Sequence, residues 1–352
     1  MKPSEPQQQR PNSDVNAISN AIGALRADDD MHELAQAHGQ LDPKAIEKLS
    51  PEAARQEPTI ADAVRRMLKQ QGRDTDPQSL VPGVTRKDIM VDGAAGPLHA
   101  FVYRPDGVEN PLAILYFHGG GWVIADAEVY DAGARGLAKA AQAIVVSVDY
   151  RLAPEHMFPA AWDDALAAYR WLSANAASLG ADASRLALAG ESAGGNLAVA
   201  TAVAARDEGL PPPVHVLSVY PVVQAQNRST VSYVENAIAK PLNKAMMEWF
   251  FEHVASPQDL TDARLNLTRA NLAGLPPVTI INASIDPLRS DGEMLEEALQ
   301  TAGVPVERRI YSGVTHEFFG AGAVVGKARA AMQFAGERLR ETEPSTLGRR
   351  LS

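Results

Sequence analysis

Short apolar runs alternate with segments of helical apolar spacing from about residue 84 onward. A short apolar run between two helical stretches is typical of a strand buried in a parallel sheet. The predicted strands are residues 87–91, 98–103, 112–117, 143–148, 186–189, 214–219, 278–283 and 307–311. The predicted helices are residues 130–141, 162–173, 195–206, 291–301 and 327–340.

The first two predicted strands differ from the others because only the short turn Asp92-Gly93-Ala94-Ala95-Gly96 separates them. Strands joined in this way pair antiparallel. The remaining strands are joined through helices, which is how parallel strands are connected. The pattern therefore predicts an α/β fold with a mostly parallel, eight-stranded sheet flanked by helices.

Three stretches depart from this alternation, leaving residues 81–222 and 276–345 as the main body. Residues 1–20 are polar and rich in Gln, Pro and Asn, so we expect them to be disordered. Residues 21–80 have helical character, with a helix starting near Thr59 and stopping at Gly72, and form either a lid or a surface hairpin. Residues 223–275 show no strand pattern, which favours an insertion of helices over one end of the sheet.

Composition narrows the classes of protein to which the chain belongs. The 352 residues include 33 Lys and Arg against 43 Asp and Glu, without a basic block, which argues against nucleic acids and anionic membranes as partners. A hydrophobic fraction of 45% is sufficient for a large core, and the lack of cysteine excludes disulfides and thiolate chemistry. No apolar signal core or membrane-length apolar run occurs, so we expect a cytoplasmic protein without a stable membrane anchor.

The segment Gly190-Glu191-Ser192-Ala193-Gly194-Gly195 lies between a predicted strand and a predicted helix. This is the context in which Gly-x-Ser-x-Gly forms a nucleophile elbow. Glycines are needed on both sides of the serine because a side chain there would collide with the adjacent strand or helix. The turn exposes the Ser192 hydroxyl at a helix N-terminus, where amide donors favour an anion.

Candidate partners for Ser192 follow two later strands. Asp286 comes directly after the run ending at Ser284, and His316 comes shortly after the last predicted strand. The order Ser, Asp, His is that of α/β hydrolases. A serine hydroxyl needs a base to take its proton, histidine suits that role, and an aspartate holds the imidazole in the correct tautomer.

Other residues compete for these roles. Among the eight histidines, His156 lies in a loop that could approach the site, but it precedes the serine. His32, His38, His99, His215 and His253 are expected on the surface or in the core. Asp291 is the main rival of Asp286, but its position favours capping the next helix. Glu317 is expected to be a solvated or loop-pairing acid.

The glycine run His118-Gly119-Gly120-Gly121-Trp122 follows the third predicted strand. Consecutive glycines let the backbone pass close to a ligand and direct its N–H groups toward it. The amides of Gly120, Gly121 and Ala193 would then converge on an oxyanion.

Four motifs together resemble the hormone-sensitive-lipase family of α/β hydrolases, in its bacterial carboxylesterase branch. They are His118–Trp122, Asp149-Tyr-Arg-Leu-Ala-Pro-Glu155, Gly190–Gly195, and Asp286-Pro-Leu-Arg289 together with His316-Glu-Phe318. The resemblance extends from about residue 84 to the last predicted helix, and weakly includes the N-terminal helices. Glu191 departs from the family pattern, where Asp is commoner, and this change affects local hydrogen bonding.

The resemblance implies an α/β-hydrolase fold with a helical cap, to which residues 21–80 and the 223–275 insertion contribute. It also implies a catalytic triad and an oxyanion hole, consisting of Ser192, Asp286 and His316, and of Gly120, Gly121 and Ala193. His118 would brace the glycine loop, and Arg151 would pair with Glu155 within a supporting segment.

The implied function is hydrolysis of small carboxylic esters with short to medium acyl chains, through an acyl-enzyme and without a metal or organic cofactor. An amidase or acyltransferase with the same triad, and a non-catalytic small-molecule receptor, are the alternatives. The residues Met246, Met247, Trp249, Phe250 and Phe251 are candidates for lining the pocket, although we expect at least half to pack within the cap. The last strand is a possible sheet edge and would permit a homodimer.

Overall fold

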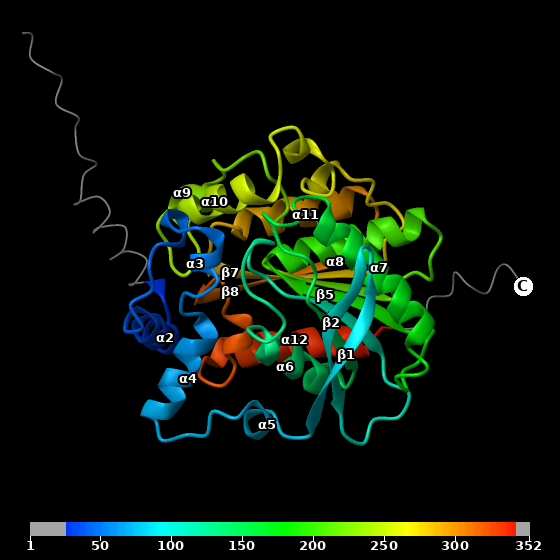
Figure 1. Cartoon of the computed structure of the whole chain (residues 1–352), viewed down its shortest axis with the longest axis horizontal. Helices are drawn as coiled ribbons and strands as arrows, with labels where there is room; N and C mark the ends of the chain where they lie inside the picture. The colour runs from blue at the N-terminus through cyan, green and yellow to red at the C-terminus, as the bar shows by residue number, and fades with distance from the viewer. Residues whose placement is uncertain (1–25, 343–352) are drawn as a thin grey trace, which may run out of the picture.

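Eight strands form a single sheet in the computed structural model, which describes residues 26–342 (Figure 1). The predicted disordered stretch 1–20 lies outside the described residues. The sheet order is β1-β2-β4-β3-β5-β6-β7-β8, in which β1–β2 and β2–β4 pair antiparallel and all other pairs are parallel. The predicted α/β fold is therefore confirmed. The strands are β1 Val84–Gly93, β2 Gly96–Pro105, β3 Ala113–Phe117, β4 Ile144–Val148, β5 Leu186–Glu191, β6 His215–Val219, β7 Val278–Ile285 and β8 Val306–Thr315.

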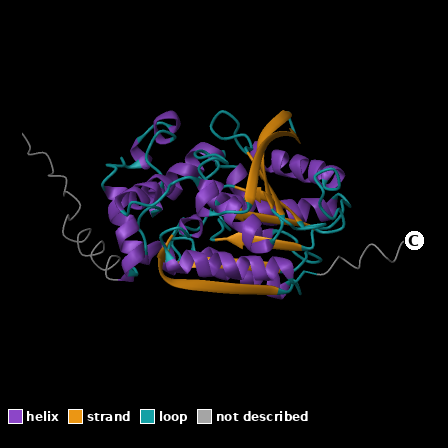
Figure 2. Cartoon of the chain, turned by 90° about the horizontal axis from the view of Figure 1, so that it is seen from below, coloured by secondary structure: helices purple, strands orange, loops and turns teal. Residues whose placement is uncertain are grey.

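Helices cover both faces of the sheet (Figures 1 and 2). The helices α7 (Ala160–Asn175), α8 (Ala193–Asp207) and α11 (Arg289–Thr301) pack on one face. The helices α6 (Asp131–Ala141) and α12 (Gly326–Arg340) pack on the other. Every residue of the central strands β3, β4, β5 and β6 is buried as a consequence, which explains their continuous apolar runs.

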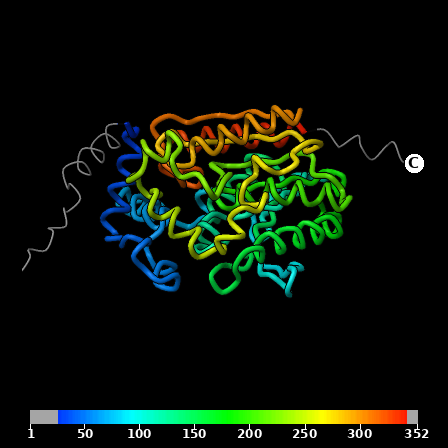
Figure 3. Tube along the Cα trace, turned by 90° about the horizontal axis from the view of Figure 1, so that it is seen from above, coloured from blue at the N-terminus to red at the C-terminus, as the bar shows by residue number. Residues whose placement is uncertain are grey.

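The two edges of the sheet are formed by β8 and by the β1–β2 hairpin, coloured orange and cyan in Figure 3. The predicted edge position of the last strand is confirmed. Ile310 on this strand is exposed, at 45% of its full area. A homodimer formed through this edge stays a prediction. Within residues 26–342, no helix has both the length and the apolar character needed to cross a membrane.

The N-terminal segment consists of short helices, namely α2 Asp29–Gly39, η1 Ile46–Lys48, α3 Pro51–Ala54, α4 Ile60–Gln70 and α5 Pro77–Leu80. Helix α4 begins after Thr59, as predicted. The Thr59 hydroxyl accepts a hydrogen bond from the Asp62 amide at 3.2 Å, and the Asp62 carboxylate accepts one from the Thr59 amide at 2.9 Å. This reciprocal cap stabilises the start of an otherwise short helix.

Residues 223–275 are described throughout and contain no strand. Their helices are α9 Val231–Glu235, α10 Lys244–Val254, η2 Asp259–Thr261 and η3 Leu267–Arg269, and one further short helix, η4 Phe319–Ala321, follows β8. Helices α9 and α10 of the insertion lie beside the N-terminal segment (Figures 1 and 3). Trp249 of α10 donates its indole N–H to the Leu49 carbonyl at 3.2 Å, so the two segments are directly joined.

The predicted ion pair between Arg151 and Glu155 is wrong. Arg151 instead makes a two-pronged contact with the carboxylate of Asp164 on α7, at 2.7 and 2.9 Å. Asp164 is fully buried and needs a compensating cation, which Arg151 supplies. Glu155 binds Arg55 of the N-terminal segment through two contacts of 2.7 Å, and these hydrogen bonds lower the pKa of Glu155 to about 2.

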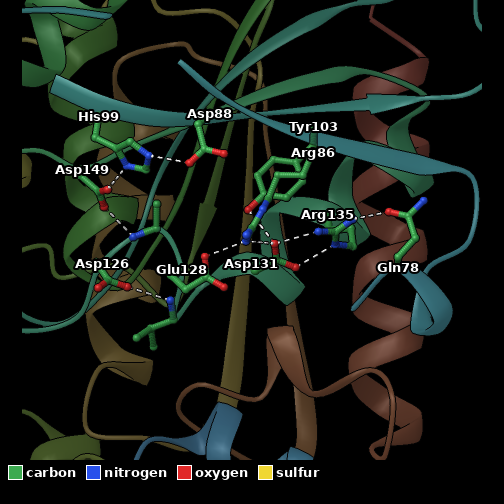
Figure 4. Close-up of polar contacts among 12 residues, drawn as sticks. Gln78, Arg86, Asp88, His99, Tyr103, Asp126, Glu128, Asp131, Arg135 and Asp149 are labelled. Carbon is green, nitrogen blue, oxygen red and sulfur yellow. Dashed lines mark hydrogen bonds and ion pairs between the residues drawn. The ribbon is translucent and has the colours of Figure 1, made fainter. Parts of the chain in front are cut away.

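A cluster of charged side chains holds the β1–β2 hairpin to the start of α6 (Figure 4). Buried Asp131 accepts hydrogen bonds from Arg86 at 2.8 Å, from the Tyr103 hydroxyl at 3.0 Å and from Arg135 at 2.8 Å. Arg86 also binds Glu128 at 2.8 Å. The two guanidinium groups compensate the buried carboxylate, and a negative charge is favourable at a helix N-terminus.

Asp149 fixes the loop that precedes α6 (Figure 4). Its carboxylate accepts a hydrogen bond from the Ala127 amide at 2.7 Å and lies 2.7 Å from Nδ1 of His99. The other ring nitrogen of His99 lies 3.1 Å from Asp88, and hydrogen bonds to the two carboxylates, chiefly that of Asp149, raise the pKa of His99. Asp149 thus supports the loop that follows the glycine run, as the family resemblance implies.

Arg55 is one of the residues that attach the N-terminal segment to the main body. Besides its contacts with Glu155, it donates to the carbonyl oxygens of Val123 at 2.8 Å and of Ala153 at 2.9 Å. We predict that Arg55→Ala destabilises this attachment by about 2 kcal/mol, because charged hydrogen bonds are lost. The measurement is the rate at which a protease cleaves the segment containing α3 and α4.

The matched control is Arg65→Ala in the same segment. Arg65 forms an exposed pair with Asp62 at 2.6 Å, and such pairs contribute at most about 1 kcal/mol. Equal cleavage rates in the two variants would show that Arg55 does not anchor the segment.

Candidate active site

The three predicted site residues are placed by neighbouring parallel strands. Ser192 follows β5, Asp286 follows β7 and His316 follows β8. These strands run in one direction and lie next to one another through β6, so their carboxyl ends share one edge of the sheet. Ligand sites of open α/β sheets form at this edge.

The side chains of these residues form a continuous hydrogen-bonded chain. Nε2 of His316 lies 3.0 Å from Oγ of Ser192, and Nδ1 of His316 lies 2.7 Å from Oδ2 of Asp286. The second oxygen of Asp286 accepts from the Leu288 amide at 2.8 Å. The structure therefore brings together all three residues that the sequence singled out.

All three side chains are buried, at 6%, 0% and 3% of their full exposure for Ser192, Asp286 and His316. Burial by itself disfavours the imidazolium and lowers the pKa of His316. The charge and hydrogen bond of Asp286 oppose this effect and, with smaller contributions from Glu317 and Glu191, leave the pKa of His316 above its ordinary value. The site thus favours a proton on the imidazole once one is transferred to it.

The turn between β5 and α8 has little room for side chains. Ser192 adopts φ +58°, ψ −116°, outside the usual regions for residues other than glycine. A Cβ atom at Gly190 would overlap the Gly194 carbonyl, and a Cβ atom at Gly194 would overlap the carbonyl oxygen of Phe117 on β3. The amide of Ser192 donates to the Val219 carbonyl at 2.8 Å and fixes the turn to β6.

The glycine run after β3 bends around the same place. Gly120 and Gly121 have φ values of +100° and +60°, which favour glycine. The Gly120 carbonyl accepts from the amides of Val123 at 3.1 Å and Ile124 at 3.0 Å, closing the loop on itself. Within residues 26–342, the amide N–H groups of Gly120, Gly121 and Ala193 have no protein acceptor, and so remain available as donors.

His118 supports this loop, as predicted. Its ring stacks on Tyr150 with centroids 4.3 Å apart, and its Nδ1 lies 2.7 Å from the Gly119 carbonyl. The Tyr150 hydroxyl donates to the His118 carbonyl at 2.8 Å. Burial lowers the pKa of His118, so this ring stays neutral.

The rival residues do not take part in the hydrogen-bonded chain of Ser192, His316 and Asp286. Asp291 is not the helix cap that we expected, because α11 begins two residues earlier and the Asp291 carboxylate instead accepts from the Val223 amide at 2.8 Å. Burial raises the pKa of Asp291 to about 7. His156 is exposed, and no hydrogen bond joins it to Ser192 or His316 within the described residues. Glu317 is half-buried and accepts from the Tyr130 hydroxyl at 3.5 Å.

A cavity of about 1680 Å³ opens onto Ser192 and His316. It is bounded by the glycine run, by the N-terminal segment and by the insertion. Met246 and Phe250 line it, whereas Met247, Trp249 and Phe251 are buried in the core. The expectation that at least half of these five residues are used for packing is therefore confirmed.

Two tyrosines near the site were not recognised from the sequence. Tyr116 on β3 and Tyr220, directly after β6, donate their hydroxyl groups to the two oxygens of Glu191. The ring of Tyr220 also lies against His316, with centroids 4.4 Å apart. No sequence motif marks either tyrosine, since both lie at the ends of ordinary apolar strands.

Comparisons with known proteins agree with this fold. A family model described as "alpha/beta hydrolase fold" matches residues 114–320. Esterase LipI of Mycobacterium tuberculosis is 43% identical over 277 residues, covering 77% of this chain and 85% of the relative. Carboxylesterase NlhH of the same organism is 40% identical over 281 residues, covering 78% and 88%.

Among solved structures, an esterase of Pyrobaculum calidifontis superimposes with a TM-score of 0.76 at 36% identity, covering 84% of this chain and 94% of that chain. The protein is thus an α/β hydrolase. Within that class, the chain belongs to the hormone-sensitive-lipase-like family of carboxylesterases and is a carboxylic ester hydrolase.

The close packing at Gly194 gives a test of the turn. We predict that Gly194→Ala lowers the free energy of unfolding by about 1–3 kcal/mol, because the new methyl group meets backbone oxygens that cannot rotate away. Thermal unfolding measures the change. The control is Gly39→Ala on α2, where no atom lies within 4 Å and the effect should be below about 1 kcal/mol. Equal stability of the two variants would contradict the packing argument.

Proposed function

We propose that Ser192 is the nucleophile of ester hydrolysis, that His316 is its general base and that Asp286 orients His316. The observation that carries this assignment is the hydrogen-bonded chain from Ser192 through His316 to Asp286, with separations of 3.0 and 2.7 Å. A serine becomes an effective nucleophile when a positioned base takes its proton. Asp286 fixes the imidazole tautomer and stabilises the imidazolium.

In the first half of the reaction, Oγ of Ser192 bonds to the ester carbonyl carbon while its proton passes to Nε2 of His316. The carbonyl oxygen becomes an oxyanion and accepts hydrogen bonds from the amides of Gly120, Gly121 and Ala193. The tetrahedral intermediate then collapses, the bond to the alcohol oxygen breaks, and that oxygen leaves with the proton from His316.

In the second half, water attacks the acyl carbon and gives its proton to His316. Collapse of the second oxyanion intermediate breaks the bond to Ser192, whose oxygen takes the proton back. The carboxylic acid leaves, and each group returns to its starting state. All reacting protons therefore pass through one imidazole nitrogen.

The proposed substrates are small esters with short to medium acyl chains. This proposal is supported by Phe250 of α10, whose ring lies so close to Gly121 that even a methyl group there would overlap it. The ring therefore occupies space in the cavity beside the proposed oxyanion donors. Met246 adds a second apolar surface from the same helix.

The nucleophile assignment predicts that Ser192→Ala lowers kcat by about 10⁴-fold or more without unfolding the protein. Asp286→Asn should lower kcat by about 10⁴-fold, because the amide favours the wrong imidazole tautomer. Asp291→Asn is the matched control, since Asp291 is equally buried but contacts the Val223 amide rather than His316. Steady-state hydrolysis of nitrophenyl acetate measures all three. A severe effect of Asp291→Asn with a mild effect of Asp286→Asn would reverse the assignment of the acid.

The substrate assignment predicts faster turnover of nitrophenyl acetate and butyrate than of nitrophenyl palmitate, and slower turnover of the matching nitroanilides. Hydrolysis of both series can be followed by the release of the coloured product. A preference for the anilide would instead support an amidase. Faster turnover of the palmitate ester would contradict the proposed limit on acyl length.

A further inference from the structure

Glu191, the residue directly before Ser192, carries a buried carboxyl group that the mechanism above does not use. Its side chain is 1% exposed. One carboxylate oxygen accepts from the hydroxyl of Tyr116 on β3, and the other accepts from the hydroxyl of Tyr220 after β6. Since β5 lies between β3 and β6, each neighbouring strand contributes one donor.

The space around this carboxyl group is closely fitted. Gly133 of α6 faces it, and a Cβ atom at that position would overlap both the Glu191 carboxylate and the Tyr116 hydroxyl. Among the described residues, the hydrogen bonds to the Glu191 side chain come from the two tyrosines, and no arginine or lysine forms an ion pair with it. A buried carboxylate without a cation is costly, so simple filling of this space would favour an apolar side chain.

Tyr220 connects Glu191 to the proposed base. The ring centroids of Tyr220 and His316 are 4.4 Å apart, at an interplanar angle of 49°. Tyr220 is fully buried and its amide donates to the Ile281 carbonyl at 2.6 Å, so the ring is held on both its backbone and its hydroxyl ends. The hydrogen bond from Tyr220 to Glu191 therefore helps to set the position of the ring that lies against His316.

We propose that Glu191 is a positioning residue for His316: in its ionised form it holds Tyr220 against the imidazole and provides a second negative charge, besides Asp286, that favours the imidazolium. This proposal rests on the proposed function of Ser192 and His316. When Glu191 takes up a proton, the protonated oxygen becomes a hydrogen-bond donor. The tyrosine hydroxyl facing that oxygen can then no longer donate to it and must direct its hydrogen elsewhere.

The groups facing Glu191 are Tyr116, Tyr130, Tyr220, Glu317 and His316. Burial raises the pKa of Glu191 to about 7, although the hydrogen bonds from Tyr116 and Tyr220 lower it and Glu317 raises it further. In turn, the ionised Glu191 raises the pKa of His316. As pH falls, both groups take up protons. Protonation of His316 removes the base, and protonation of Glu191 removes a negative charge that raises the pKa of His316.

The test is the acid side of the pH profile of kcat/KM for nitrophenyl acetate. We expect the unmodified enzyme to require two ionisations. In Glu191→Gln, which keeps the size of the side chain, the profile should fit a single ionisation at lower pH. The maximal kcat should fall about tenfold with little change in KM, since tenfold corresponds to one pKa unit of stabilisation.

Glu317→Gln is the matched control, because Glu317 is the other carboxyl group that raises the pKa of His316, and burial likewise raises its own pKa. In this variant the profile should shift as a whole and must still require two ionisations. If the second ionisation disappears in Glu317→Gln and persists in Glu191→Gln, the proposal is wrong.

Tyr220→Phe gives an independent test, because the ring remains and only the hydroxyl donor is lost. Glu191 should then hold its proton more tightly, so the second ionisation should move to higher pH. If Glu191 had a purely structural role, the pH profile of kcat/KM would contain no ionisation that moves in this variant.

A last measurement needs no turnover and therefore separates this proposal from the proposed function. The imidazole of His316 is titrated by NMR in Ser192→Ala and in the double variant that also carries Glu191→Gln. The proposal requires a lower His316 pKa in the double variant, and equal values overturn it. If Ser192→Ala itself hydrolysed esters normally, the nucleophile assignment would fail, whatever the titration showed.

Discussion

The close approach of the β5–α8 turn to the backbone of β3 is the constraint on which the rest of the site depends. No Cβ atom fits at Gly190 or Gly194, because carbonyl oxygens already occupy the space. This packing holds Ser192 at φ +58°, a conformation that costs free energy unless its surroundings enforce it. In return, the serine side chain leaves the strand at the edge where β7 and β8 also end, with a helix N-terminus directly behind it.

The rest of the site is assembled from rigid pieces around that turn. Asp286 follows β7, which is buried along nearly its whole length, and His316 follows the buried C-terminal end of β8, so the sheet fixes both backbones. The glycine run is held from behind by His118 and Tyr150. The N-terminal part of the cavity wall is held separately, by apolar side chains of α2 and α4 that pack against the main body and by the hydrogen bonds of Arg55. The geometry of the chemistry and the shape of the pocket are thus fixed by separate parts of the structure.

This division explains what could be predicted from the sequence. Strands, helices and the positions of Ser192, Asp286 and His316 follow from local patterns, since each side chain lies shortly after a predicted strand. The partner of Arg151 could not be predicted, because the choice between Glu155 and Asp164 depends on which carboxylate is buried. Asp291 was misread for the same reason: its carboxylate is directed by an amide from a distant loop, not by its place near a helix start.

Three buried carboxyl groups near the site differ in their hydrogen-bond partners, and these partners determine the role of each group. Asp286 accepts hydrogen bonds from an amide and faces an imidazole that can become a cation. Asp291 of α11 accepts a hydrogen bond from the amide of Val223, the first residue of the insertion, and so holds the start of the insertion. Within residues 26–342, the Glu191 carboxylate accepts only from neutral hydroxyl groups, and burial raises its pKa to about 7, as it does for Asp291. Among the described residues, Glu191 is bonded to Tyr220, whose ring lies against His316, whereas Asp291 is bonded to the Val223 amide. The contact with Tyr220 is what separates the proposed positioning role of Glu191 from the structural role of Asp291.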